Sequence, residues 1–438
     1  MNIKTLTLNN FRCFEQAEFE FDERITLVIG DNTKGKTTIL EGLSVAMGGF
    51  LLGVPNSYAG DTKKAFIRNL HKQDIHRYFA STKEVATPEF SNNCQVRARG
   101  RVGGEPCLEW GRLLSKQGAR PNNSNCAEIK AEASRLYDSS VNSPEPEKLP
   151  VLVYYGTGRL WAGQKTTLKN QLKEANTAFG YYYSLKPDAQ NKTLMPWLEK
   201  MDRIAYQQRN QPPLILEAVL DAIQQMIPGA TGCYYSSEYA ELAVEFGHKV
   251  FPYSDLSDGQ RNIITLVGDL AMRCAHLNQH LGKEAARKTP GIVLVDEIDA
   301  NIHPSWQKTL LPKLLTYFEN IQFVVTSHSP FILQSLDYGK IINLDHLANP
   351  EQDAELWDRG VEDIVTEVMG VDTPRSEQYQ RMLTVAQQYY RLLDEGAATD
   401  SAEVTALAAK LDAFEEEFSR HPAYVAMLRA GRNLQGVD

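Results

Sequence analysis

One segment of the chain combines glycine, lysine and threonine at a spacing that suits phosphate binding. Residues 30–37 satisfy the pattern G-x-x-x-x-G-K-[ST], between an apolar run that predicts a strand and a pattern over 37–47 that predicts a helix. Backbone N–H groups of such a loop can surround phosphate oxygens. Lys36 would reach the terminal phosphates of ATP, and Thr37 would ligate Mg²⁺. The residues expected to line this site are Gly30, Asn32, Gly35, Lys36, Thr37 and Thr38.

Two consecutive carboxylates follow a second apolar run. Residues 292–295 predict a buried strand, and Asp296 and Glu297 come directly after it. Ligands collect at the carboxyl ends of parallel strands. We expect Asp296 to hold Mg²⁺ and Glu297 to polarise an attacking water as general base. Such a run is common by itself, but beside a phosphate loop it indicates nucleotide hydrolysis.

A third segment, Leu256 to Arg261, precedes a predicted helix. It resembles the LSGGQ signature of ABC-type ATPases, with Asp258 in place of a glycine. Ser257, Gly259 and Gln260 lie where a hydroxyl and helix N-terminal N–H groups would meet a γ-phosphate. In that family the phosphate belongs to nucleotide held by a partner subunit. The resemblance therefore implies a dimer, or a larger homo-oligomer, bridged by ATP.

Further matches narrow the resemblance to the RecF/SMC-like branch of the ABC ATPases. His328 follows a predicted strand and is similar to the switch histidine that contacts the γ-phosphate. Residues 8–14 are similar to the L-x-N-F-R opening of RecF-like heads, in which the arginine, here Arg12, sits close to the nucleotide. Residues 296–299 are similar to the DEID of SMC heads, not to the DEP of transporters.

A closer match, less specific than the ABC motifs, is a resemblance to stand-alone ATPases of bacterial anti-phage systems. It rests on 154–161, Lys165, 299–307 and 360–393. These ATPases include the Septu type (PtuA-like), often paired with an HNH nuclease, and the PARIS type (AriA-like), paired with a TOPRIM-containing effector. The resemblance implies a scaffold or regulator of a separate effector nuclease. We find no HNH or TOPRIM pattern in this chain.

Several residues depart from these patterns. Thr33 stands where RecF-like loops usually have glycine, and a side chain disfavours positive φ. His303 stands where the SMC D-loop has aspartate. Gln73 is the best match to a Q-loop glutamine, although an exposed glutamine explains it equally well. His276 and His280, four residues apart, are interpreted as the polar face of a helix rather than a metal site.

Alternating strands and helices in the first and last thirds predict an α/β fold whose parallel sheet is covered on both faces. We expect an ABC-type P-loop head with an inserted region and a helical C-terminal extension. The expected divisions are an N-terminal lobe at 1–80, an insertion at 81–250 with a core strand near 150–155, a C-terminal lobe at 251–345, and the extension at 346–438.

Composition excludes other classes. The 438 residues carry a net charge of −9, so the chain as a whole is no basic nucleic-acid coat. The apolar runs are far shorter than the roughly 20 residues that span a bilayer, and the N-terminus lacks a signal-peptide pattern. Six scattered cysteines favour free thiols in a reducing cytosol. Two basic clusters offer DNA contact, but a solvated surface is the preferred interpretation. Their members are Lys63, Lys64, Arg68, Lys72, Arg77, and Arg97, Arg99, Arg101, Arg112, Lys116, Arg120.

Three functional hypotheses follow. The first is a regulatory ATPase of a phage-defence complex, which predicts stable assembly with a neighbouring protein. The second is a RecF-like DNA repair or maintenance ATPase, which predicts DNA-stimulated hydrolysis and salt-sensitive DNA affinity. The third is a transporter motor. It is disfavoured because the stretch between Lys36 and Ser257 is longer than a compact transporter domain. A transporter motor would also need a membrane partner.

Overall fold

The computed structural model divides the chain into two compact units, residues 1–364 and residues 365–438. The division therefore falls within the stretch that the sequence assigned to the helical extension. None of the described helices is long and apolar enough to cross a bilayer. The residues that the structure describes are 1–55, 67–79, 88–104, 106–160, 177–187, 193–208, 212–346, 359–371, 373, 375–399, 401–418 and 426.

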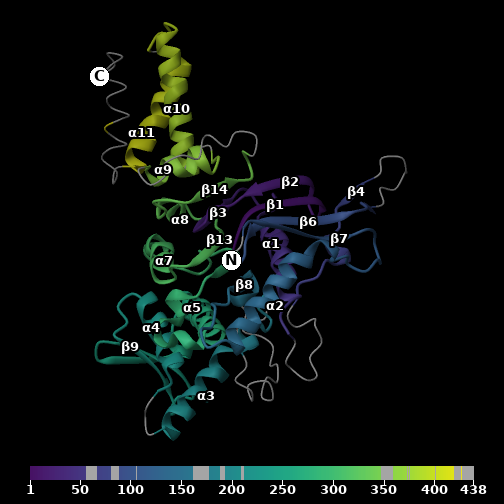
Figure 1. The fold of residues 1–438 in the computed structure, drawn as a ribbon. Helices are drawn as coiled ribbons and strands as arrows, with labels where there is room; N and C mark the ends of the chain where they lie inside the picture. The colour runs from purple at the N-terminus through teal and green to yellow at the C-terminus, as the bar shows by residue number, and fades with distance from the viewer. Residues whose placement is uncertain are drawn as a thin grey trace. The chain divides into compact units, whose positions relative to one another are not determined.

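A five-stranded parallel sheet forms the centre of the first unit (Figure 1). Its order is β14-β3-β13-β12-β8, and every neighbouring pair is parallel. The strands are β3 (Ile25–Ile29), β8 (Val151–Tyr155), β12 (Gly291–Val295), β13 (Ile321–Thr326) and β14 (Lys340–Asn343). The side chains of β3, β8, β12 and β13 are buried throughout, as expected for parallel strands covered on both faces. All five carboxyl ends therefore lie along one edge of the sheet.

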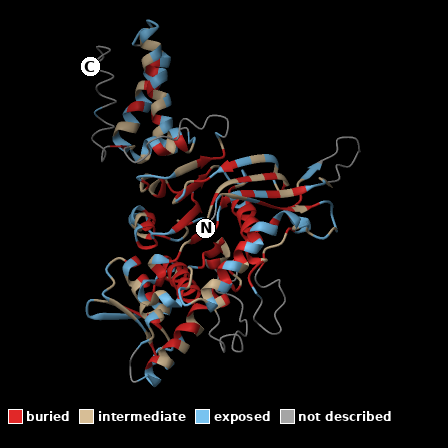
Figure 2. Cartoon of the chain, viewed as in Figure 1, coloured by how far each residue is buried: buried red, intermediate tan, exposed pale blue. Residues whose placement is uncertain are grey.

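The second sheet is antiparallel and has the order β2-β1-β6-β7. It consists of β1 (Asn2–Phe11), β2 (Phe14–Glu20), β6 (Cys94–Arg101) and β7 (Leu108–Leu114). Helix α1 (Lys36–Leu51) contacts β1, β6 and β7 of this sheet and β8, β12 and β13 of the parallel sheet. It lies between the two sheets, which explains why it is almost wholly buried (Figure 2).

This arrangement corrects the expected insertion. Residues 81–250 do not form one inserted unit, because β6 pairs with β1. The core strand expected near 150–155 is β8, which pairs with β12. Alternation of buried Cys94, Val96 and Ala98 with exposed Arg97 and Arg99 is the period-2 pattern that could have revealed β6. Only the part after β8 packs as a separate layer, on the helix that follows the signature segment.

That helix, α5 (Asp258–Leu277), contacts α3 (Leu194–Gln207), α4 (Leu214–Met226) and the strand β8. A small antiparallel sheet, β11-β10-β9, packs beside α3 and α4. The strands are β9 (Gly232–Ser236), β10 (Glu241–Phe246) and β11 (Lys249–Pro252). The other strands and α-helices among the described residues of the first unit are β4 (Arg77–Phe79), β5 (Pro88–Phe90), α2 (Ala127–Asn142), α6 (Ala285–Lys288), α7 (Pro304–Tyr317), α8 (Pro330–Gln334) and α9 (Val361–Asp363).

The second unit contains a helical hairpin of α10 (Glu377–Asp394) and α11 (Ala402–Glu417). Each helix is capped by a serine, Ser376 or Ser401, whose hydroxyl accepts a hydrogen bond from a backbone N–H of the first turn. Met382, Tyr389 and Leu411 contribute to the hairpin core. The part of the expected helical extension that forms α10 and α11 is therefore a self-packed pair of helices.

Candidate active site

The phosphate loop connects β3 to α1 with a backbone that favours glycine. Gly30 and Gly35 have φ of 137° and 108°, and Thr33 adopts φ of 72° despite its side chain. Thr33 therefore takes the left-handed conformation for which glycine is usual. Nζ of Lys36 donates to the carbonyl oxygens of Gly30 (2.6 Å) and Asp31 (2.9 Å), so the ammonium folds across the loop. Burial lowers the pKa of Lys36, and Asp345 and Asp296 partly oppose this shift.

The turn between β1 and β2 packs directly on this loop. A Cβ at Gly35 would lie 2.7 Å from Sγ of Cys13 and 2.7 Å from the ring of Phe14, so no larger residue fits. The Cys13 thiol also lies 3.5 Å from the hydroxyl of Thr38. Arg12 is the neighbour of Cys13 in this turn, and its closeness to a nucleotide stays a prediction from the RecF-like resemblance.

Arg12 is held by two carboxylates. Its Nε donates to Oδ1 of Asp74 at 3.1 Å, and its Nη2 lies 3.5 Å from Oε2 of Glu41 on α1. Arg68 donates to both of the same carboxylates. Burial by itself would raise the pKa of Asp74, but the hydrogen bonds and charge of Arg68 bring it below the ordinary value. The sequence did not indicate this network, because its members are separated by up to 62 positions.

Two oxygen donors of the kind that Mg²⁺ prefers lie side by side. The hydroxyl of Thr37 donates to Oδ2 of Asp296 at 2.9 Å, although the residues are 259 positions apart. A hydroxyl and a buried carboxylate at the rim of a phosphate loop fit a magnesium ion shared with a phosphate. Bound there, Mg²⁺ would neutralise developing charge on the phosphate oxygens. Thr37 and Asp296 are the residues that would hold it.

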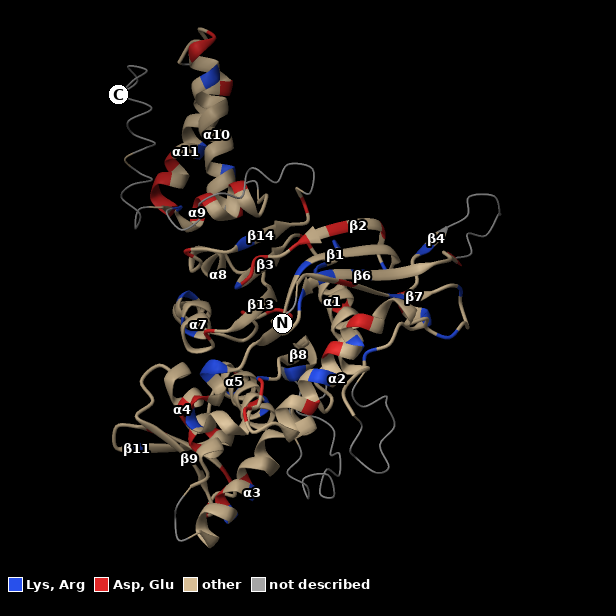
Figure 3. Ribbon diagram, in the orientation of Figure 1, with Lys and Arg blue, Asp and Glu red and all other residues tan. Residues whose placement is uncertain are grey.

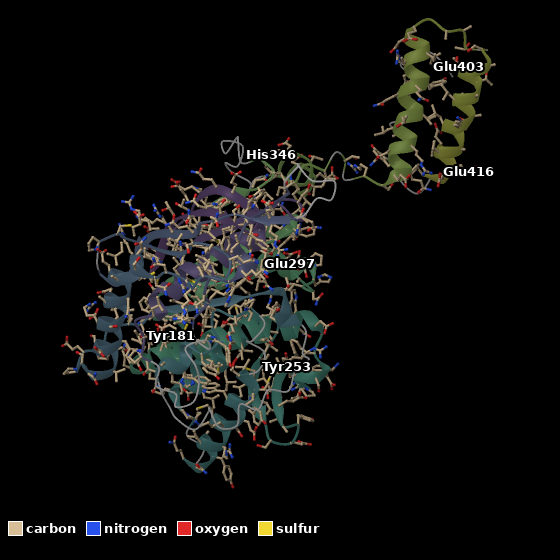
Figure 4. All side chains as sticks on the ribbon, turned by 90° about the vertical axis from the view of Figure 1, so that its right-hand side faces the viewer. Tyr181, Tyr253, Glu297, His346, Glu403 and Glu416 are labelled. Carbon is tan, nitrogen blue, oxygen red and sulfur yellow. The ribbon has the colours of Figure 1, made fainter. Side chains whose placement is uncertain are left out.

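Glu297 occupies a strained position at the end of β12 (Figure 4). Its φ is 47°, a left-handed value that is uncommon for a residue with a side chain. Its backbone N–H donates to the hydroxyl of Thr326 at 2.8 Å, and its side chain is exposed. His328 follows β13 and is exposed as well. Both candidate catalytic side chains therefore stand at the same sheet edge as the phosphate loop, open to solvent.

The signature segment forms the N-terminus of α5. Ser257 is the N-cap, and its hydroxyl accepts from the N–H of Gln260, whose side-chain oxygen accepts in return from the N–H of Ser257. Gly259 packs against the segment after Glu297, since a Cβ there would lie 2.5 Å from the carbonyl oxygen of Asn301. Ser257 itself is exposed. The turn thus presents a capped helix terminus outward.

The structure adds Asp345, which the sequence did not single out. It follows β14, and its Oδ2 accepts from the N–H of Asp31 at 2.7 Å. Its Oδ1 lies 3.5 Å from Nζ of Lys34. A carboxylate therefore anchors the start of the phosphate loop to the strand next to β3. The available indication was its place two residues after β14, near the carboxyl end of a parallel strand.

The interpretation of His276 needs correction. His276 is buried rather than part of a polar face: its ring centroid lies 4.8 Å from that of Phe179 and 5.8 Å from that of Trp197. Burial lowers its pKa to about 3.

Gln73 is exposed within the short helix Lys72–Asp74, which does not follow a strand of the parallel sheet. The strand that lies beside β12 is β8, so the segment after β8 occupies the sheet edge. Asn32 is exposed in the loop, and Lys165 lies outside the described residues.

The chain matches models of known domain families. An AAA domain model matches residues 5–228, just over half of the 438-residue chain. The chain belongs to the AAA domain family. A second AAA domain model matches residues 206–334, which include the signature helix and the acidic strand. The chain is also similar to "DNA replication and repair protein RecF" of Agathobacter rectalis, with 38% identity over 103 residues, 24% of this chain and 26% of that protein.

Curated relatives share different lengths of this chain. "Retron Ec83 probable ATPase" of Escherichia coli is 36% identical over 126 residues, which is 29% of this chain and 23% of that protein. "Retron Vc95 probable ATPase" of Vibrio cholerae is 23% identical over 406 residues, 78% of this chain and 74% of that one. "Septu protein PtuA" of Bacillus mycoides is 36% identical over 116 residues, 26% of this chain and 15% of that one. The chain thus spans less than two thirds of the Ec83 and PtuA proteins.

Among solved structures, the SMC head domain from Thermotoga maritima matches with a TM-score of 0.41 and 16% identity. The match covers 78% of this chain and 94% of that domain.

Proposed function

We propose that this chain binds ATP with Mg²⁺ at Lys36, Thr37 and Asp296, and that Glu297 accepts a proton from the water that attacks the γ-phosphorus. The bond to the bridging oxygen of ADP then breaks, giving ADP and phosphate. The 2.9 Å hydrogen bond between Thr37 and Asp296 carries this proposal. It joins the two residues proposed to hold Mg²⁺, which come from distant segments, beside the phosphate loop.

The proposed role of the nucleotide is to join copies of the chain. Ser257, at the N-terminus of α5, is exposed, and its capping hydrogen bonds are local ones with Gln260. It is therefore available to a γ-phosphate held by a second copy. Hydrolysis would remove that phosphate and loosen the assembly. The names of the retron and Septu relatives favour a place in anti-phage defence. We propose a scaffold or regulator of an effector nuclease, of HNH or TOPRIM type, encoded nearby.

The test measures native mass and ATPase rate of the purified chain, with and without the product of the adjacent gene. Wild type and Glu297→Gln are compared, because the variant should retain ATP and trap the assembled state. We expect co-assembly with the neighbour and a rate that duplex DNA leaves unchanged. A chain that remains alone, and whose rate rises several-fold with duplex DNA, would contradict the scaffold role.

One observation favours the alternative, a RecF-like repair ATPase. Arg97, Arg99 and Arg101 project from one face of β6 and are all exposed, on a unit where acidic and basic side chains are otherwise interspersed (Figure 3). Two of the other expected basic residues are less available. Arg112 is fully buried, and Arg68 is paired with Glu41 and Asp74.

Phosphate contacts by this arginine row would make DNA affinity fall steeply with salt. Replacing the three arginines by glutamine and measuring duplex-DNA binding at two salt concentrations tests the alternative. A shallower salt dependence in the triple variant would support it, and no DNA binding by the wild type would remove it.

A further inference from the structure

Arg159 is a buried arginine at the sheet edge that the proposed hydrolysis does not yet use. It lies in the short helix Thr157–Leu160, directly after β8, and its residue surface is 4% exposed. Burial lowers the pKa of its guanidinium to about 10, opposed by the charges of Asp296 and Glu297. The group is therefore a cation at neutral pH, enclosed beside the two acidic residues of the site.

The guanidinium binds the backbone of both acidic residues. Nη1 donates to the carbonyl oxygen of Asp296 at 2.5 Å, and Nη2 donates to that of Glu297 at 2.7 Å. Nη1 also donates to the carbonyl oxygen of Gly156 at 3.0 Å. These bonds tie the acidic strand end to the segment after β8.

This contact falls where the backbone is strained. Glu297 has φ of 47°, and a left-handed residue with a side chain persists only when its surroundings hold it. The hydroxyl of Thr326 holds its N–H, and Arg159 holds its carbonyl oxygen. The conformation that directs Glu297 out of the sheet edge is therefore fixed from both sides.

The same guanidinium reaches the signature helix. Its Nε donates to Oδ1 of Asn262, in the first turns of α5, at 3.1 Å. Nδ2 of Asn262 donates in turn to the carbonyl oxygen of Ala300 at 3.0 Å. A continuous set of hydrogen bonds thus joins the helix that begins at Ser257 to the backbone of Glu297 and to the segment that follows it.

We propose that Arg159 is a positioning residue that couples the signature helix to Glu297, so that docking of α5 on a second copy's nucleotide sets the orientation of the hydrolytic carboxylate. This inference rests on the proposed ATP hydrolysis and names the residue that regulates it. A planar guanidinium supplies five N–H donors in a fixed fork, which the three carbonyls and the amide use together. A lysine ammonium keeps the charge but not the fork.

The variants are Arg159→Lys, Asn262→Asp and the double variant. Asn262→Asp keeps an oxygen for Arg159 but loses the donor to Ala300. Arg24→Lys is the matched control, because Arg24 also binds backbone carbonyls, those of Leu315, Phe318 and Ile321, at the amino end of β3. Each protein is assayed for melting temperature, affinity for a non-hydrolysable ATP analogue, and kcat and KM of ATP hydrolysis.

We expect Arg159→Lys to lower kcat by about 10- to 100-fold, the range that misplacement of a reacting group produces, with analogue affinity unchanged. Asn262→Asp should lower kcat less, and the double variant should be no slower than Arg159→Lys, because the two residues act in one set of bonds. Arg24→Lys should lower the melting temperature and leave kcat unchanged at temperatures where it is folded.

The inference is overturned if Arg159→Lys retains kcat, if its loss of rate equals that of Arg24→Lys at matched stability, or if the two substitutions are additive in the logarithm of kcat. If Arg159→Lys does not fold, the comparison of Asn262→Asp with wild type decides: unchanged kcat overturns the inference. A wild type that binds ATP but does not hydrolyse it would instead defeat the proposed function.

Discussion

The hydroxyl of Thr326 donates a 2.6 Å hydrogen bond to Oδ1 of Asp296, and both groups are buried. The same hydroxyl accepts the backbone N–H of Glu297. One side chain at the end of β13 therefore fixes the proposed metal carboxylate and the backbone of the proposed base. Parallel pairing of β12 with β13 is what brings them together.

Thr326→Val should lower both stability and turnover. The substitution preserves the shape of the side chain but leaves the Glu297 N–H and one oxygen of Asp296 without their partner, which costs about 1–3 kcal/mol for each buried group left unpaired. We expect a lower denaturant midpoint and a reduced kcat. Thr326→Ser, which restores the hydroxyl, should recover most of the rate. Equal loss in the valine and serine variants would show that the hydroxyl is not responsible.

Glu297→Gln should separate binding from hydrolysis. General-base catalysis contributes about 10²- to 10⁴-fold, so kcat should fall by that range. ATP affinity should persist, because Lys36 and Thr37 are untouched. Single-turnover hydrolysis and binding of a fluorescent ATP analogue measure the two effects. Glu319→Gln, at an exposed position just before β13 and away from the site edge, is the control that should retain the wild-type rate.

His276 makes stability depend on pH in a stated direction. Burial lowers its pKa to about 3, with further lowering by Lys200 and Arg273, against about 6.5 in the unfolded chain. Because the unfolded chain binds the proton first, this contribution is present above pH about 6.5 and is lost as pH falls toward about 3. The loss amounts to about 1.4 kcal/mol per pH unit within that window.

His276→Phe should remove that part of the pH dependence while keeping a ring against Phe179 and Trp197. The free energy of unfolding of wild type and variant should be measured from pH 7 to pH 4. The difference between them should change with pH in favour of phenylalanine on acidification. His248→Phe, in the exposed turn between β10 and β11, is the control and should leave the wild-type slope. A constant difference between wild type and His276→Phe would contradict the assignment.

A buried ion pair within α5 is linked to β8 by a hydrogen bond. Nε of Arg273 lies 2.7 Å from Oδ2 of Asp269, and the hydroxyl of Tyr155 donates to the same oxygen at 2.8 Å. Removing one partner leaves a buried charge unpaired, so Asp269→Asn should reduce the free energy of unfolding by about 3–5 kcal/mol. Lys288→Ala, which breaks the exposed pair with Glu284, should change it by less than about 1 kcal/mol. Chemical denaturation measures both, and similar small losses would contradict the prediction.

The local elements were predictable because each depends on neighbours in sequence. The phosphate loop, the run 292–295 followed by two acids, and the helix after Ser257 are contiguous patterns, and each lies on the expected element. Capping of α5 by Ser257 and Gln260 uses residues three apart. Hydrophobic period and capping chemistry suffice to place such segments.

The pairings were decided by tertiary structure alone. Thr37 meets Asp296 across 259 positions, and Arg159 meets Glu297 across 138. Because β6 pairs with β1, the strand Cys94–Arg101, which was expected in an insertion, belongs to the sheet of the N-terminal lobe.

The sequence by itself determined the chemistry available to this protein: a phosphate loop, a pair of acids and a capped helix terminus. Only the folded chain decided which of those groups share one sheet edge and which buried side chains hold them. The physical reason is that strand order and hydrogen bonds between distant segments depend on burial of the whole core, whereas a loop or a cap depends on a few adjacent residues.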